Sequence, residues 1–159
     1  VEALHTAVER AELNAKVIET CCKRLRVLFR DAENCKKCDE AGTATAVVGA
    51  MGSLPSVANV QLQALAAIVN LCSGEANDHR KNAVASGAMK AIVMAMNSLP
   101  HHAEVQEMAC IALQNCCYGE DPHAITRRKT AGAEGALEAV VRAMIKFEQS
   151  GEQLSLIHI

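Results

Sequence analysis

The chain has 159 residues, half of them apolar and only 2% aromatic, with 16 lysines and arginines against 18 aspartates and glutamates. The near-neutral charge and the scarcity of aromatic rings exclude general electrostatic attraction or base stacking as a route to direct nucleic-acid binding. No run approaches the ~18 consecutive apolar residues of a membrane span, and the prominence of Ala and Leu favours an all-α fold in about one domain.

The chain contains copies of itself. Residues 41–75 and 86–120 are identical at 17 of 35 positions, with a spacing of 45 residues. Residues 80–96 match 128–144 at 10 of 17 positions, with a spacing of 48. The N-terminal residues 1–8 align with 89–96, with a spacing of 88. A period of about 45 residues is typical of helical repeat proteins.

The copies divide the chain into five parts. We predict a partial copy over 1–30, full copies over 31–75 and 76–120, a partial copy over 121–148, and a tail over 149–159 without a counterpart. Each full copy is predicted to hold three helices. In chain order the expected helices are a second helix from residue 1, a third over 13–29, then 33–41, 43–53, 57–72, 77–86, 88–98, 103–117, 125–134 and 136–148.

Glycine and proline mark the ends of these helices. Pro55 and Pro100 each follow a Ser-Leu pair and stop the second helices, while Gly74 and Gly119 follow the third helices where a left-handed C-cap is expected. Alanines at matched positions of the third helices would let neighbouring helices approach closely.

The copies resemble the armadillo repeat family. The resemblance rests on Glu33-Asn34 through Glu40-Ala41-Gly42, on the Gly-Ala start of the helix at 87–93, and on the run 105–116, which begins Val-Gln and ends Asn-Cys. It implies a right-handed α-solenoid whose third helices line a concave groove for an extended peptide or partner protein. The chain shows no polar cap at either end, so we expect a piece of a longer array with uncovered apolar end faces.

The resemblance also implies which residues face the groove. In the nuclear-import adaptors of the family, a groove Asn holds the ligand backbone and a Trp one turn earlier forms pockets for basic side chains. Asn70 and Asn115 match the Asn, but the Trp positions carry Ala66 and Ile111, and the first copy has Lys23 and Val27 at the two places. Binding of basic import signals is therefore not expected.

Counting by helical turns from the two asparagines gives the candidate partner-binding surface, here called the third-helix face. Its expected members are Lys23, Arg26, Arg30, Gln63, Ala66, Asn70, Ser73, Met108, Ile111, Asn115 and Tyr118. An amide side chain can pair with both backbone groups of an extended ligand. The alternative is that each Asn braces the turn that follows its own helix.

Four bases without an acid lie close together at Lys23, Arg24, Arg26 and Arg30. If they face the groove, they would favour an acidic peptide. The alternative is a solvated helix end, where cations are favoured by the helix dipole. The run Arg127-Arg128-Lys129 repeats Arg80-Lys81 in part and is interpreted as a solvated feature of the first helices.

The eight cysteines are expected to be reduced thiols in a reducing compartment, because most of them, Cys21 included, lie in Ala- and Leu-rich helical segments where a reduced Cys acts as a small core residue. They are Cys21, Cys22, Cys35, Cys38, Cys72, Cys110, Cys116 and Cys117. Cys116-Cys117 is predicted to pack between copies. His101-His102 has no repeated counterpart and remains an unsupported metal candidate.

No catalytic, phosphate-binding or metalloprotease motif is present. We therefore expect a non-enzymatic protein-interaction scaffold, cytoplasmic or nuclear, without a cofactor, a small-molecule substrate or a membrane span. The alternatives are the regulatory arm of a larger enzyme of the ubiquitin-ligase or kinase type, or a divergent nuclear-transport adaptor.

Cys35 and Cys38 have the spacing of half a zinc site, but no second pair of ligands follows. We expect the purified protein to hold no stoichiometric zinc. Elemental analysis would contradict this with one zinc per chain that is lost in Cys35→Ser.

Overall fold

The computed structural model describes residues 2–74 and 77–150 and is all-helical there, as the sequence predicts. The third helices are α1 (Glu2–Leu28), α4 (Ala58–Leu71) and α7 (Ala103–Cys117). The second helices are α3 (Thr43–Ser53), α6 (Ala88–Ser98) and α9 (Ala136–Ser150). The first helices are α2 (Ala32–Glu40), α5 (Asn77–Ala85) and α8 (Pro122–Ala133). None of the described helices is both long and apolar enough to cross a membrane.

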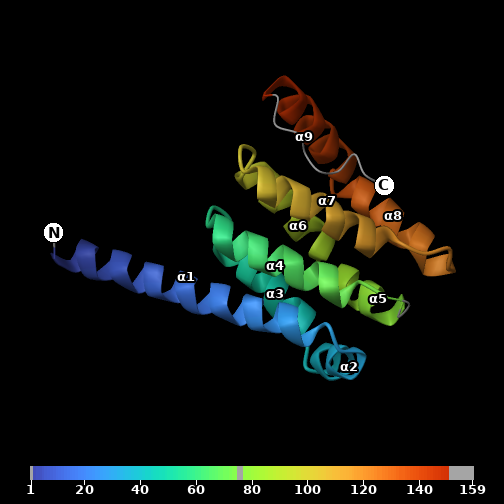
Figure 1. Ribbon diagram of the computed structural model, residues 1–159, viewed down its shortest axis with the longest axis horizontal. Helices are drawn as coiled ribbons and strands as arrows, with labels where there is room; N and C mark the ends of the chain where they lie inside the picture. Colours follow the sequence, from blue (N-terminus) through green and yellow to red (C-terminus); the bar gives the residue numbers. More distant parts are fainter. Residues whose placement is uncertain (1, 75–76, 151–159) are drawn as a thin grey trace.

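Each helix packs on the helix three elements further along the chain. Thus α1 contacts α4 and α4 contacts α7, α3 contacts α6 and α6 contacts α9, and α2 contacts α5 and α5 contacts α8. Within a copy, α3 packs on α4 and α6 packs on α7. Figure 1 shows α1, α4 and α7 side by side in front of α3 and α6, with the first helices gathered toward one end.

The helices begin and end near the glycine and proline residues that the sequence predicts. Gly42 and Gly87 precede α3 and α6 with φ angles of 71° and 91°, a left-handed conformation that strains any residue with a Cβ. The two helices end at Ser53 and Ser98, before Leu-Pro in both copies, because Pro cannot continue a helix. The expected left-handed glycines after α4 and α7 are confirmed.

The predicted break in the first copy is wrong. Residues 2–28 form one continuous helix of 27 residues rather than a second helix followed by a third. The later copies interrupt the chain at this point with Ser-Leu-Pro, but the first copy has Glu9-Arg10-Ala11-Glu12, which contains no helix breaker. The predicted tail also starts later, since Gln149 and Ser150 belong to α9, and 151–159 lie outside the described residues.

Alanine and branched aliphatic residues fill the space between the helices. The matched alanines Ala64, Ala67, Ala109 and Ala112 are all fully buried. Two glutamines are buried among them. Gln106 Nε2 on α7 donates to the carbonyls of Met96 and Leu99 at 2.8 and 3.0 Å, at the end of α6. Gln61 makes the same pair of bonds one copy earlier. Each glutamine therefore ties a third helix to the end of its own second helix.

We predict that Gln106→Leu lowers the free energy of unfolding by about 2–3 kcal/mol, because two buried carbonyls lose their donor. Urea unfolding followed by circular dichroism measures the change. Gln114→Leu, on the exposed side of the same helix, is the matched control and should stay within about 0.5 kcal/mol of the parent. Equal losses in both variants would contradict a special role for Gln106.

Candidate functional site

The predicted partner-binding residues lie on α1, α4 and α7 and in the turns that follow them. Those exposed to solvent are Lys23, Arg30, Ser73 and Tyr118. Those half-buried are Arg26, Gln63, Asn70, Met108, Ile111 and Asn115. Ala66 is 5% exposed, which leaves its methyl group little surface for contact with a ligand.

The two asparagines bond across neighbouring third helices. Asn70 Nδ2 on α4 donates to the carbonyl of Arg26 on α1 at 2.6 Å. Asn115 Nδ2 on α7 donates to the carbonyl of Val69 on α4 at 3.0 Å. The alternative that each Asn braces its own turn through its side chain is therefore also inaccurate. Each amide instead braces the preceding third helix.

These bonds meet a need of the backbone. The last carbonyls of a helix have no partner within the helix. The amide of Arg30 bonds to Val27 and that of Ser73 bonds to Asn70, one residue later than a continued α-helix would require. The carbonyls of Arg26 and Val69 are thereby left for the asparagines. Because the acceptor stands at the same place in both helices, the two bonds keep α1, α4 and α7 in register.

Each of the two asparagines has polar groups that no described protein atom satisfies. Among the described residues, no hydrogen bond reaches Oδ1 of Asn70 or of Asn115, and the second N–H of each amide is likewise unused. Two further polar atoms on this face are buried and lack a protein partner, namely Arg26 Nε and Gln63 Oε1. The third-helix face therefore offers both a donor and an acceptor on neighbouring helices.

The interpretation of the repeated Arg-Lys pairs as solvated features is wrong for two arginines. Arg80 and Arg127 are 3% and 2% exposed. Arg127 Nε donates to the carbonyl of Cys116 at 2.9 Å, and its Nη2 donates to that of Tyr118 at 2.6 Å and to Asp121 Oδ2 at 3.0 Å. The hydrogen bond from Arg127 lowers the pKa of Asp121, and the bonds to the two carbonyls hold Arg127 at the end of α7. Charge-assisted hydrogen bonds thus offset the cost of burying the Arg127 guanidinium.

Arg80 joins two successive copies. Its guanidinium donates to the carbonyl of Gly74, after α4, and through Nε to the carbonyl of Asn115, on α7, at 3.1 Å. It also lies 5.3 Å from the centre of the Tyr118 ring, a cation–π distance. Arg128, the counterpart of Arg80, is exposed and donates to Gly119. Sequence reasoning missed these roles, because the carbonyl that each arginine reaches depends on the fold and not on spacing along the chain.

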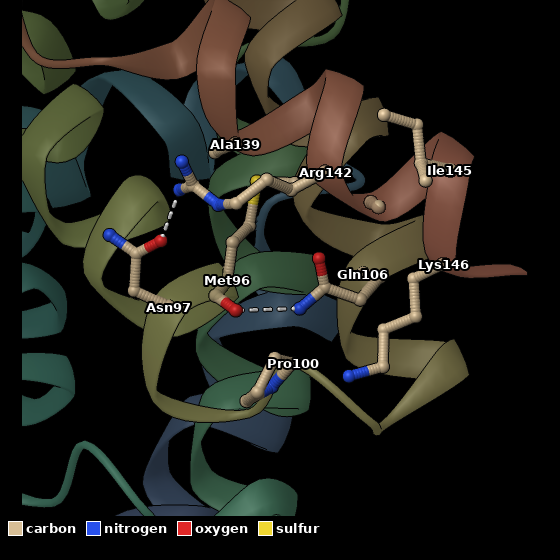
Figure 2. A pocket seen from close by; sticks show the side chains of 9 residues that line it. Met96, Asn97, Pro100, Gln106, Ala139, Arg142, Ile145 and Lys146 are labelled. Carbon is tan, nitrogen blue, oxygen red and sulfur yellow. Dashed lines mark hydrogen bonds between the residues drawn. The ribbon is translucent and has the colours of Figure 1, made fainter.

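A separate groove lies between α6, α7 and α9 and encloses about 500 Å³. Figure 2 shows Arg142 reaching Asn97, to which it donates at 2.6 Å, while Gln106 points into the groove floor beside Met96. Lys146 donates to Nε2 of His101 at 3.1 Å. Because its rim cations already have protein partners, this groove is a weaker candidate for a charged ligand than the third-helix face.

The cysteines and histidines do not form a described metal centre. No group of three or more His, Cys, Asp or Glu side chains within the described residues could hold a metal ion. All eight cysteines are free thiols. Cys35 donates to the carbonyl of Phe29 at 3.2 Å, and burial raises the pKa of its thiol.

Two predictions about the cysteines meet different outcomes. Packing between copies is confirmed for Cys116, whose thiol lies 3.7 Å from the sulfur of Cys72, and this contact and burial raise its pKa. A core position is wrong for Cys21, which is exposed on α1, whereas burial raises the pKa of its neighbour Cys22 to about 11.

Comparisons with protein-family models, with curated proteins and with solved structures found no match to this chain.

We predict that Asn70→Ala and Asn115→Ala each lower the free energy of unfolding by about 1–3 kcal/mol, because a helix carbonyl loses its donor. Urea unfolding of the full chain measures this. Gln114→Ala changes an exposed neighbour on the same helix and should have little effect. If the free energy of unfolding of both asparagine variants matched that of the control, the bonds to Arg26 and Val69 would not stabilise the fold.

Proposed function

We propose that this chain is part of a right-handed armadillo-type solenoid and works as a non-enzymatic scaffold that binds an extended acidic peptide on its third-helix face. The support for the solenoid is the regular stacking of each helix on the helix three elements later. The internal sequence copies, with spacings of 45 and 48 residues, support the same interpretation.

The observation that carries the binding proposal is the pair of unsatisfied buried atoms, Arg26 Nε and Gln63 Oε1. Buried polar atoms are normally hydrogen-bonded, and exceptions need an explanation. An extended peptide presents alternating N–H and C=O groups, so one backbone can satisfy a donor and an acceptor on neighbouring helices. The free Oδ1 atoms of the asparagines on α4 and α7 extend the same pattern.

The spacing of the helices suits such a ligand. Packed helices lie about 8–10 Å apart, and three residues of an extended chain span about 10 Å. A peptide that crosses α4 and α7 would therefore present a backbone group to Asn70 and, three residues later, to Asn115.

The charge near the C-terminal end of α1 favours acidic side chains in the ligand. Lys23, Arg24 and Arg30 are exposed, and the structure gives them no described carboxylate partner. The nearest acids in sequence are otherwise engaged, since Glu19 pairs with Lys16 and Asp31 accepts a hydrogen bond from the Asn34 amide as the cap of α2. An incoming carboxylate would thus meet cations that are not already neutralised.

We predict that a fluorescein-labelled extended peptide rich in glutamate binds the full chain, and that its lysine-rich counterpart does not. Lys23→Glu combined with Arg30→Glu should weaken binding at least tenfold by fluorescence polarisation, because two attractive contacts become repulsive. Lys81→Glu combined with Lys129→Glu, two exposed bases on α5 and α8, is the charge-matched control. Equal affinity for both peptides, or equal losses in the double variant and the control, would overturn the proposal.

The asparagines test the backbone contact separately. Asn70→Ala and Asn115→Ala are each expected to weaken binding of the same peptide about tenfold under conditions where circular dichroism shows a folded chain. If affinity is unchanged in both, their role is confined to bracing the third helices.

A further inference from the structure

A groove lies between the second helices α3 and α6, in the middle of the described chain, and encloses about 230 Å³. Buried apolar side chains form its floor, while Lys90 and the 40%-exposed Met94 stand at its rim on α6. We call this space the second-helix groove. The lining residues that matter below are Val48, Met51, Gly52, Pro55, Lys90 and Met94.

The groove belongs to the repeated part of the fold. The space between α6 and α9 keeps the same methionine, proline and two alanines at matched positions, since Met96, Pro100, Ala139 and Ala143 correspond to Met51, Pro55, Ala91 and Ala95. The helix α6 uses different residues to line its two grooves. Although α9 packs on α6, the second-helix groove stays open. A following copy therefore does not cover it.

Two substitutions distinguish the second-helix groove from its counterpart. In the later groove, Arg142 on α9 donates to Asn97 on α6 at 2.6 Å and so bridges the two helices (Figure 2). The matched positions hold Met94 and Gly52, which lack the groups for such a bond. A Cβ at Gly52 would meet no neighbouring atom within 4 Å. The second-helix groove is therefore without this polar bridge and apolar along both walls.

The size and the lining indicate what fits. A space of about 230 Å³ is smaller than the roughly 300–1,000 Å³ of sites for drug-sized ligands, so it suits one large side chain. Met51 and Met94 line it from opposite helices. Because methionine sulfur makes favourable contacts with aromatic rings, an aromatic side chain complements these walls best.

The charge at the rim adds a second feature. Lys90 is exposed, and the structure gives it no described carboxylate partner. None of the described residues that line the groove is acidic. A carboxylate beside the aromatic ring would therefore meet a cation that is not already neutralised. We propose that the second-helix groove docks a segment of another protein that presents an aromatic side chain next to a carboxylate.

This docking site is independent of the proposed peptide binding, because its residues lie on α3 and α6 and not on the third-helix face. The double variant Lys23→Glu and Arg30→Glu should leave it intact, and its failure would leave the third-helix proposal untouched.

Nuclear magnetic resonance of the full chain, labelled with ¹³C at the methionine methyl groups, tests the proposal. The probes are acetyl-Phe-Glu-amide, acetyl-Phe-Lys-amide and acetyl-Ala-Glu-amide. We expect the first to shift the Met51 and Met94 signals, assigned from Met51→Leu and Met94→Leu, and the other two to bind at least fivefold more weakly. Lys90→Glu should reverse the preference between the Glu and Lys probes, because it reverses the charge at the rim.

Filling the groove separates docking from folding. Gly52→Leu places a side chain in the open space and should weaken the first probe at least tenfold. Since leucine is a far better helix former than glycine, the melting temperature should not fall. Gly49→Leu is the matched control: Gly49 is also exposed on α3 with no neighbouring atom within 4 Å of its Cβ position, but it does not line the groove.

Three results would each overturn the proposal. The first is that no probe shifts the Met51 and Met94 signals. The second is equal affinity of the parent chain for the Glu and Lys probes. The third is that Gly52→Leu and Gly49→Leu weaken binding to the same extent.

Discussion

Side-chain hydrogen bonds to the last carbonyls of neighbouring helices are the interaction on which this structure depends. A helix leaves its final carbonyls without partners, and water usually satisfies them. Here the helix ends are packed against other helices, so side chains must do so. Gln61 and Gln106 bond the ends of the second helices, and Asn70 and Asn115 bond the ends of the third helices. Arg80 and Arg127 also donate to carbonyls in the turns that follow the third helices, those of Gly74 and Tyr118.

Each of these bonds also connects two parts of the stack. A glutamine joins a third helix to the second helix before it, an asparagine joins successive third helices, and Arg80 joins successive copies. The short side chain of Asn can reach the neighbouring helix only because the helices lie close together, and the fully buried Ala64, Ala67, Ala109 and Ala112 permit that approach. Small apolar residues and polar caps are therefore parts of one arrangement, which explains how a chain with 2% aromatic residues builds a core.

The helix positions could be predicted because they depend on local signals. Glycine and the Leu-Pro pairs set the bounds of α3 and α6 in agreement with the sequence analysis. The continuous α1 was missed because alignment to a later copy outweighed the lack of a breaker near residue 9. The roles of Arg80, Arg127 and the two glutamines depend on which carbonyl lies nearby in space, and spacing along one sequence does not reveal that. The sequence does show that Gln61 and Gln106 recur at the same place within an apolar helix pattern.

The same bonds limit what the third-helix face can recognise. One N–H of each asparagine amide is committed to the neighbouring helix, whereas Oδ1 has no described hydrogen-bond donor. Gln63 contributes a second acceptor and Arg26 a donor. In the proposed complex, a ligand would therefore bring backbone N–H groups toward α4 and α7 and an acceptor toward α1. An extended chain does so, whereas a helical ligand has its backbone groups already paired. Acidic side chains in that extended chain would then meet the bases at the end of α1, so backbone shape and charge select the same class of ligand.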